Sequence, residues 1–161
     1  MKFQLINFQT AKKYLIRDRG THVFFLHNYS GRLEIDIKKP GAKVYIFGVF
    51  EGRDKDIFRL ETIQRHSAPE TFSDLLIKGA FFDQSKFLYR GLIKIEKRAQ
   101  LSHAFQKNQN LIMSKNVFVS SQPDLEIKAN DVFCTHGSTT GKLDKNQLFY
   151  LASRGLDPKK A

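Results

Sequence analysis

Short runs of apolar residues recur along most of the chain. At Leu33, Ile35 and Ile37 the apolar residues occupy every second position, which is typical of a β-strand with one buried face. The strands expected from such runs cover residues 3–6, 13–16, 22–26, 32–37, 43–47, 56–60, 71–79, 87–95, 110–113, 117–119 and 125–127. The pattern therefore predicts an all-β fold over most of the sequence.

Polar segments rich in turn residues separate these runs. Residues 17–20, 28–31 and 38–41 have the composition of turns, and the runs lie about ten residues apart, a spacing shared by sandwiches, barrels and β-solenoids. Two-residue Asn-Gly and Asp-Gly hairpin turns are absent, which mildly favours strands wound around a coil. Periodicity alone does not distinguish a sandwich, a barrel and a β-solenoid. Asn108 and Asn110 would suit solenoid turns, but their local sequence favours two solvated loop amides.

The pattern changes near the C-terminus. Asp144 is a good N-cap, apolar residues recur at helical spacing from Leu148, and Gly155 follows as a helix end. These features predict a helix over residues 145–154. The chain therefore divides into two predicted regions, a β core over residues 1–143 and a short helical region over residues 144–161.

Composition narrows the classes of function. The chain has 161 residues, 41% of them hydrophobic, which is enough to bury a globular core. Lys and Arg total 27 against 16 Asp and Glu, but no basic run exceeds two residues. A scattered excess is typical of a solvated surface, so nucleic-acid binding is not expected from charge alone. No apolar stretch is long enough to span a membrane, and Met1–Ile6 lacks the features of a signal peptide, so the cytoplasm is the expected compartment.

The single cysteine excludes an internal disulfide and a metal cage built of cysteines from one chain. Cys134 stands two residues before His136, and in an extended segment their side chains share one face. A thiol and an imidazole are ligands for zinc or iron, yet two ligands do not close a site. Any metal would need further ligands from another chain or a small molecule. Spacing alone is explained more simply by a packed cysteine and a surface histidine at a strand end.

Motifs of a self-contained enzyme are missing. No orienting carboxylate or oxyanion loop accompanies the thiol and the imidazole, so a nucleophilic site is not predicted. Residues 137–142 resemble a phosphate-binding loop only superficially, because the glycine spacing is wrong and no hydroxyl residue follows Lys142. A turn is predicted there instead, and the chain is not expected to be an enzyme.

Several segments, in order, resemble the SufB/SufD family of iron–sulfur cluster assembly proteins. The segment Cys134-Thr135-His136-Gly137, continuing into the predicted helix, is similar to the end of the family's core. Upstream, the similar segments are 71–79 (T-x-S-D-L-L-x-K-G), 87–93 (F-x-G-L-I), 106–112 (Q-x-N-x-N-L-L) and 123–127 (P-x-L-E-I). Together they extend over residues 63–157, and ordered motifs are stronger evidence than any one alone. SufB-like chains have Glu on either side of this histidine and a cysteine in the 106–112 stretch, so this chain resembles SufD.

The resemblance implies a fold, a role and partners. The family's core is a right-handed parallel β-helix, and its members act in the SUF pathway as non-enzymatic assembly components. SufB and SufD pair through their cores, and the ATPase SufC binds helices that follow the core. The resemblance carries the family's interface histidine over to His136, with Cys134 beside it as a second ligand. Iron and sulfide, or a nascent cluster, would be held only transiently and shared with a partner chain.

The sequence also departs from the family pattern. Full-length members have helical regions at both ends, whereas this sequence begins with strands and ends at Ala161. The resemblance therefore supports core pairing with a SufB-like subunit, or between two copies, more directly than docking of SufC. Glu126 and Asn108 are expected to be structural. Two alternatives stay open: a β-solenoid binding or structural module without the assembly role, and a weak nucleic-acid binder that uses the positive surface.

Overall fold

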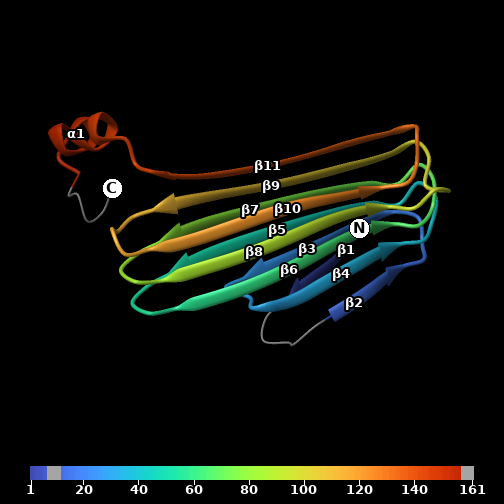
Figure 1. Cartoon of the computed structure of the whole chain (residues 1–161), viewed down its shortest axis with the longest axis horizontal. Helices are drawn as coiled ribbons and strands as arrows, with labels where there is room; N and C mark the ends of the chain where they lie inside the picture. The colour runs from blue at the N-terminus through green and yellow to red at the C-terminus, as the bar shows by residue number, and fades with distance from the viewer. Residues whose placement is uncertain (7–11, 157–161) are drawn as a thin grey trace.

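Two parallel sheets form most of the structure (Figure 1). The computed structural model describes residues 1–6 and 12–156. The elements are β1 (Lys2–Ile6), β2 (Lys12–Ile16), β3 (Thr21–His27), β4 (Gly31–Ile37), β5 (Lys43–Gly52), β6 (Ile57–His66), β7 (Phe72–Phe81), β8 (Lys86–Ile95), β9 (Ser102–Ile112), β10 (Phe118–Ile127), β11 (Val132–Lys142) and α1 (Lys145–Ser153).

Successive strands alternate between the two sheets. The odd-strand sheet has the order β1-β3-β5-β7-β9-β11, and the even-strand sheet has the order β10-β8-β6-β4-β2. Every paired strand runs parallel to its neighbour. The chain therefore winds as a β-solenoid in which each coil stacks on the previous one, and the predicted solenoid is confirmed over a sandwich or a barrel.

The register of the strands sets the length of each coil. Lys43 aligns with Phe72, which lies 29 positions further along the chain, and Lys86 aligns with Phe118, which lies 32 positions further. The first coils are shorter, because Thr21 aligns with Lys43 after 22 positions. Stacked coils place the inward side chains of one coil directly on those of the next, as repeat architectures require.

The inward faces of the two sheets enclose the core. Its largest fully buried side chains are Phe24, Phe50, Phe81, Phe87, Ile6, Leu26, Leu33, Ile35, Ile37, Ile46, Leu75 and Ile77. Toward the C-terminal coils the interior becomes polar, because β9 turns Gln106, Asn108 and Asn110 inward. The core is therefore apolar in its first coils and lined with amides near its last strand.

Two loop predictions around these amides are wrong. Asn108 and Asn110 are only 1% and 3% exposed, since β9 begins at Ser102 and includes both residues. Their side chains donate hydrogen bonds to Ser121 Oγ at 2.9 Å and Thr140 Oγ1 at 3.3 Å. Short polar residues at alternate strand positions are tolerated inside because neighbouring strands supply such partners. The predicted strands at 117–119 and 125–127 are parts of the single strand β10.

The turn predicted at residues 137–142 is also wrong, because this segment is the second half of β11. Its residues align with Lys107–Ile112 of β9, so a parallel ladder holds the segment in an extended conformation. Gly137 and Gly141 adopt this conformation as any residue would, and neither has an atom near the position of an added β-carbon.

The predicted helix is confirmed as α1. The Asp144 side chain accepts hydrogen bonds from the backbone N–H groups of Asn146 at 2.7 Å and Gln147 at 3.1 Å, as an N-cap does. Gly155 follows the helix with φ +82°, a left-handed conformation that favours glycine. Figure 1 shows α1 beyond the end of β11, away from the stacked strands. Residues 157–161 of the predicted helical region lie outside the described residues.

Candidate functional site

The candidate site lies on β11, the last strand of the odd-strand sheet. β11 pairs with β9 along one edge, and no described strand pairs with its other edge. Unpaired strand edges offer backbone N–H and C=O groups to another chain. The strand is 11 residues long and contains no proline. The end of the solenoid therefore presents a long edge that a further strand can extend.

The hydrogen-bonding alternation of parallel strands identifies the backbone groups that point to this edge. The N–H of Leu101 donates to the carbonyl of Asp131 at 2.6 Å, so the odd-numbered residues at this end of the chain are directed at β9. The even-numbered residues of β11, including His136 and Ser138, consequently direct their backbone groups at the free edge. The backbone groups and the side chain of His136 are thus both exposed at this end of the solenoid.

The last strand of the even-strand sheet has a different edge. The N–H groups of Phe118 and Lys128 donate to the carbonyls of Ser85 and Ile95, at the two ends of β8, at 3.1 Å and 2.9 Å. The even-numbered residues of β10 therefore direct their backbone groups at β8, and the odd-numbered residues direct theirs at the free edge. Pro123 is one of them and has no N–H to offer. A proline on an edge strand is a common protection against strand addition. Of the two strands that end the sheets on the C-terminal side of the described chain, β11 is the one with an edge open to pairing.

The structure places both predicted site residues on one face of β11. His136 is exposed and Cys134 is half-buried, because no further described coil covers the inward face of this strand. In register, Cys134 lies beside Ala104 and His136 lies beside Gln106 on β9. On β10, Leu125 and Ile127 are 40% and 41% exposed at positions that are buried in earlier coils.

The environment of Cys134 is apolar. The side chain packs against a small cluster that includes Ile95, Ala104 and Ala129. This burial raises the pKa of the Cys134 thiol to about 11. At neutral pH the thiol keeps its proton, whereas a metal ligand must be the thiolate. His136 is therefore the more accessible ligand of the two.

No group of three or more His, Cys, Asp and Glu side chains in residues 1–6 and 12–156 is arranged to hold a metal ion. His136 and Cys134 offer two donor atoms at most, and the neighbouring strand contributes buried amides instead of further strong ligands. These two donor atoms alone would not complete the coordination of a metal ion.

Sequence reasoning missed the buried amides beneath β11. Gln106, Asn108 and Asn110 occupy alternate positions of β9, and each aligns with an inward position of β11. The oxygens Oδ1 of Asn108 and Asn110 have no hydrogen-bond partner. The available signal was the i, i+2, i+4 spacing of these amides, which is the period of a strand.

Glu126 lies on the outer face of β10. Its carboxylate accepts hydrogen bonds from Lys94 Nζ at 2.7 Å and 2.8 Å and pairs with Lys128 at 3.2 Å. The hydrogen bonds from Lys94 and Lys128 lower the pKa of Glu126. Because its charge is matched by these lysines on neighbouring positions, Glu126 stabilises the sheet surface and is not a free ligand.

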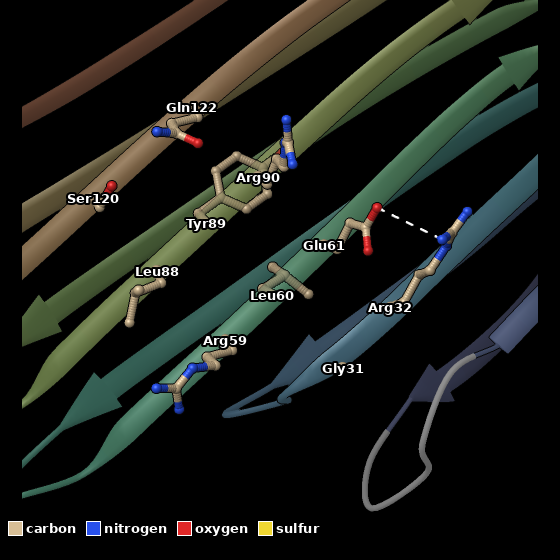
Figure 2. A pocket seen from close by; sticks show the side chains of 10 residues that line it. All are labelled: Gly31, Arg32, Arg59, Leu60, Glu61, Leu88, Tyr89, Arg90, Ser120 and Gln122. Carbon is tan, nitrogen blue, oxygen red and sulfur yellow. Dashed lines mark ion pairs between the residues drawn. The ribbon is translucent and has the colours of Figure 1, made fainter.

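A separate pocket lies on the outer face of the even-strand sheet, across the solenoid from β11 (Figure 2). Arg32, Arg59 and Arg90 line it, but Figure 2 shows the Arg59 side chain directed away from the other two. Arg32 lies 3.8 Å from Glu61, and Arg90 lies 3.6 Å from Asp124. Paired and diverging guanidinium groups do not define one anion site, so β11 remains the candidate.

Comparison with known proteins matches this end of the solenoid to a family. Residues 27–161 match the family described as "SUF system FeS cluster assembly, SufBD core domain". The chain belongs to the SufB/SufD family. The matched range includes β4 to β11, with both Cys134 and His136. The resemblance of the sequence motifs to this family is confirmed.

Individual relatives cover different parts of the chain. The iron–sulfur cluster assembly protein SufD of Escherichia coli is 40% identical over 79 residues, covering 49% of this chain and 19% of that protein. A SufBD family protein of Synechocystis is 34% identical over 89 residues, covering 55% and 20%. One from Mycobacterium leprae is 29% identical over 130 residues, covering 76% and 33%. This chain spans about a fifth to a third of the length of these relatives.

No helix in the described part of the chain has the length and apolar character needed to cross a bilayer.

Proposed function

We propose that this SufB/SufD-family chain is a non-enzymatic component of iron–sulfur cluster assembly that acts at an interface between two solenoid cores. The relatives named above are iron–sulfur cluster assembly proteins. The observation that carries the proposal is the placement of an exposed histidine on a long, unpaired strand edge at the end of a solenoid. A partner strand laid along β11 would meet His136 directly.

The incompleteness of the ligand set supports a shared site. A neutral imidazole provides one lone pair to iron, and iron–sulfur chemistry needs several ligands. The missing ligands would come from the partner core and from sulfide. Cys134 would act mainly in packing, because deprotonating its buried thiol is costly. Iron and sulfide are then cargo that passes through the interface.

The proposed partner is a SufB-like core in the cytoplasm, with a second copy of this chain as the alternative partner. Pairing through β11 would satisfy the free backbone groups of this strand. A SufC-like ATPase is a proposed component of the same assembly, and α1 would contribute to its docking.

Removing the imidazole of His136 tests the site. In anaerobic reconstitution with iron, sulfide and a SufB-like partner, His136→Ala is expected to lower the cluster yield about tenfold, because loss of a ligand costs at least that much affinity. Cys134→Ser is expected to have the smaller effect, since the thiol is packed and protonated. The yield is measured from the charge-transfer absorbance of the cluster.

The matched control for this experiment is His27→Ala, an exposed histidine at the end of β3. It removes the same side chain far from β11 and should leave the yield unchanged. Equal yields for His136→Ala and the unmodified chain would refute the role of His136. A partner-independent yield would instead refute the shared site.

Blocking the free edge tests the pairing. Ser138→Pro removes an N–H that points to the free edge, so binding to a SufB-like core should weaken at least about tenfold through the lost hydrogen bond and the altered strand. Ser138→Val keeps the N–H and the strand preference, and it should bind within about twofold of the unmodified chain. Titration calorimetry gives both affinities. If both variants bind alike, the partner does not use this edge.

A further inference from the structure

The outer face of the odd-strand sheet is apolar, which is unusual for a sheet surface exposed to water. A sheet with one solvated face alternates apolar and polar residues, whereas strands covered on both faces are nearly continuous apolar runs. The even-strand sheet follows the first pattern, as in Arg32, Leu33 and Glu34. In the odd-strand sheet, β3 and β5 follow the second pattern, as in the sequence KVYIFGVFEG of β5, whereas β9 and β11 also carry outward polar residues.

The register of the odd-strand sheet defines this outer apolar face. Its outward side chains alternate with the buried core residues and include Phe3, Leu5, Val23, Phe25, Tyr45, Phe47, Val49, Phe72, Leu76, Phe105, Leu111 and Phe133. Within residues 1–6 and 12–156 no helix or strand packs over them. Phe133, Val49 and Leu111 remain 54%, 44% and 42% exposed.

A ladder of aromatic rings crosses the face. The ring centroid of Phe72 lies 5.4 Å from that of Tyr45 and 5.7 Å from that of Phe105, and Phe105 lies 5.7 Å from Phe133. The rings are tilted by 45–47° to one another. The tilted rings pack against each other, and the aliphatic side chains of Val49, Leu76 and Leu111 form part of the surface beside them.

Positive charge flanks the ladder. Lys43, Lys78 and Lys107 project outward and are exposed. The lysines found in ion pairs among the described residues are Lys2, Lys13, Lys38, Lys94 and Lys128. Asp74 lies in register between Tyr45 and Phe105, within the ladder, and burial raises the pKa of its carboxyl group. Among the described residues, Lys43, Lys78 and Lys107 thus border the outer apolar face without forming an ion pair.

We propose that the outer apolar face is the docking surface for an amphipathic α-helix of a partner protein, with an apolar stripe flanked by Asp and Glu. An apolar sheet face is stabilised by packing a helix on it. Acidic flanks on that helix would complement Lys43, Lys78 and Lys107. This surface is distinct from the β11 edge.

Other occupants fit less well. A second copy that used the same face would bring its own lysines against Lys43, Lys78 and Lys107, and like charges in an interface are unfavourable. Single-stranded nucleic acid would also complement the lysines, but it requires ring faces open to stacking bases. Here the rings are tilted against one another, and much of the open surface is aliphatic.

The test uses two designed helical peptides with the same leucine stripe, one flanked by Glu and one by Lys, and a single-stranded DNA oligonucleotide as a third probe. Fluorescence anisotropy with the whole chain measures their affinities. The Glu-flanked peptide is expected to bind at least about tenfold more tightly than the Lys-flanked peptide, since several charge pairs of modest strength add up to that ratio.

Variants locate the binding. The double variant Lys78→Glu/Lys107→Glu should weaken the Glu-flanked peptide about tenfold, while Lys86→Glu, an exposed charge reversal on the even-strand sheet, should change it by less than about twofold. Phe47→Ser should also weaken it, and Ile57→Ser, an exposed apolar residue of the other sheet, should not. Equal affinity for the two peptides, or equal losses in variant and control, overturns the proposal. DNA binding tighter than that of the Glu-flanked peptide, and lost in the double variant, overturns it in favour of nucleic acid.

Discussion

Gly91→Ala is expected to destabilise the chain by about 3 kcal/mol, because the new methyl group has no space. A β-carbon at Gly91 would lie 2.5 Å from Nε2 of Gln106 and even closer to the hydroxyl of Tyr89. Neither neighbour moves freely. The Tyr89 hydroxyl is 2.9 Å from Thr62 Oγ1, and Gln106 is 2% exposed inside the solenoid.

Relieving the clash would break these buried contacts. Shifting Tyr89 separates its hydroxyl from Thr62, and shifting Gln106 disturbs its 3.4 Å hydrogen bond to the Gly91 carbonyl. The loss adds to the strain of overpacking and exceeds the gain from restricting the unfolded chain. Urea denaturation followed by circular dichroism at pH 7.5 measures the difference.

Gly141→Ala is the matched control, because Gly141 lies in β11 with no atom within 4 Å of an added β-carbon. Its stability should stay within about 0.5 kcal/mol of the unmodified chain. If Gly91→Ala were as stable as this control, the interior around Gln106 would be looser than the structure shows.

Acidification from pH 7.5 to pH 5 is expected to cost about 2 kcal/mol of stability through His66 alone. His66 is fully buried, with Nδ1 2.7 Å from Thr71 Oγ1 and Nε2 2.8 Å from Ser73 Oγ. Burial lowers the pKa of His66 to about 4. The hydroxyl groups satisfy a neutral ring, but the surrounding interior disfavours a charged one.

The sign of the effect follows from the protons bound by each state. In the unfolded chain the histidine has its ordinary pKa of about 6.5. Between pH 6.5 and pH 4 the ring of His66 is therefore protonated in the unfolded state and neutral in the folded state. Stability is therefore fully present above pH 6.5 and falls as the pH drops toward 4. Burial alone would raise the pKa of Glu34, but hydrogen bonding and charge from Lys13 outweigh it and lower the pKa, so the stabilisation from this carboxylate is lost as the pH falls through the acidic end of this window and below it.

Urea denaturation at the two pH values, for the unmodified chain and two variants, isolates the contribution. His66→Gln should lose about 2 kcal/mol less than the unmodified chain between pH 7.5 and pH 5, and His27→Gln, at an exposed site, should lose as much as the unmodified chain. Proton NMR of the unmodified chain should show the His66 ring still neutral at pH 5. A ring that titrates near pH 6.5 would contradict the prediction, whatever the variants do.

Local pattern predicted the elements of this fold better than their arrangement. The alternation at Leu33, Ile35 and Ile37 identifies a strand, and Asp144 with Gly155 marks the two ends of a helix. The choice of a solenoid over a barrel depends on pairing between residues about 30 positions apart, as for Lys43 and Phe72. Such pairing leaves no signature in a short stretch of sequence, so the solenoid was predicted from the resemblance to the family.

The errors have a common physical cause. Asn108, Asn110 and residues 137–142 have turn-forming composition, yet all lie in strands because the neighbouring coil supplies their hydrogen-bond partners. Tertiary context overrides local preference at such positions. The candidate site was half predictable. The shared face of Cys134 and His136 follows from the period of a strand, whereas the open edge of β11 and the high pKa of the thiol depend on which coils cover them.

The regular coil also makes the molecule a spacer with fixed increments. Each added or deleted coil of about 30 residues would move β11 by one strand spacing, about 4.8 Å, relative to the first coil, and would leave the contacts within every other coil unchanged. The distance between β1 and the free edge of β11 is therefore adjustable in whole steps. Evolution can change the reach of such a protein without redesigning either end.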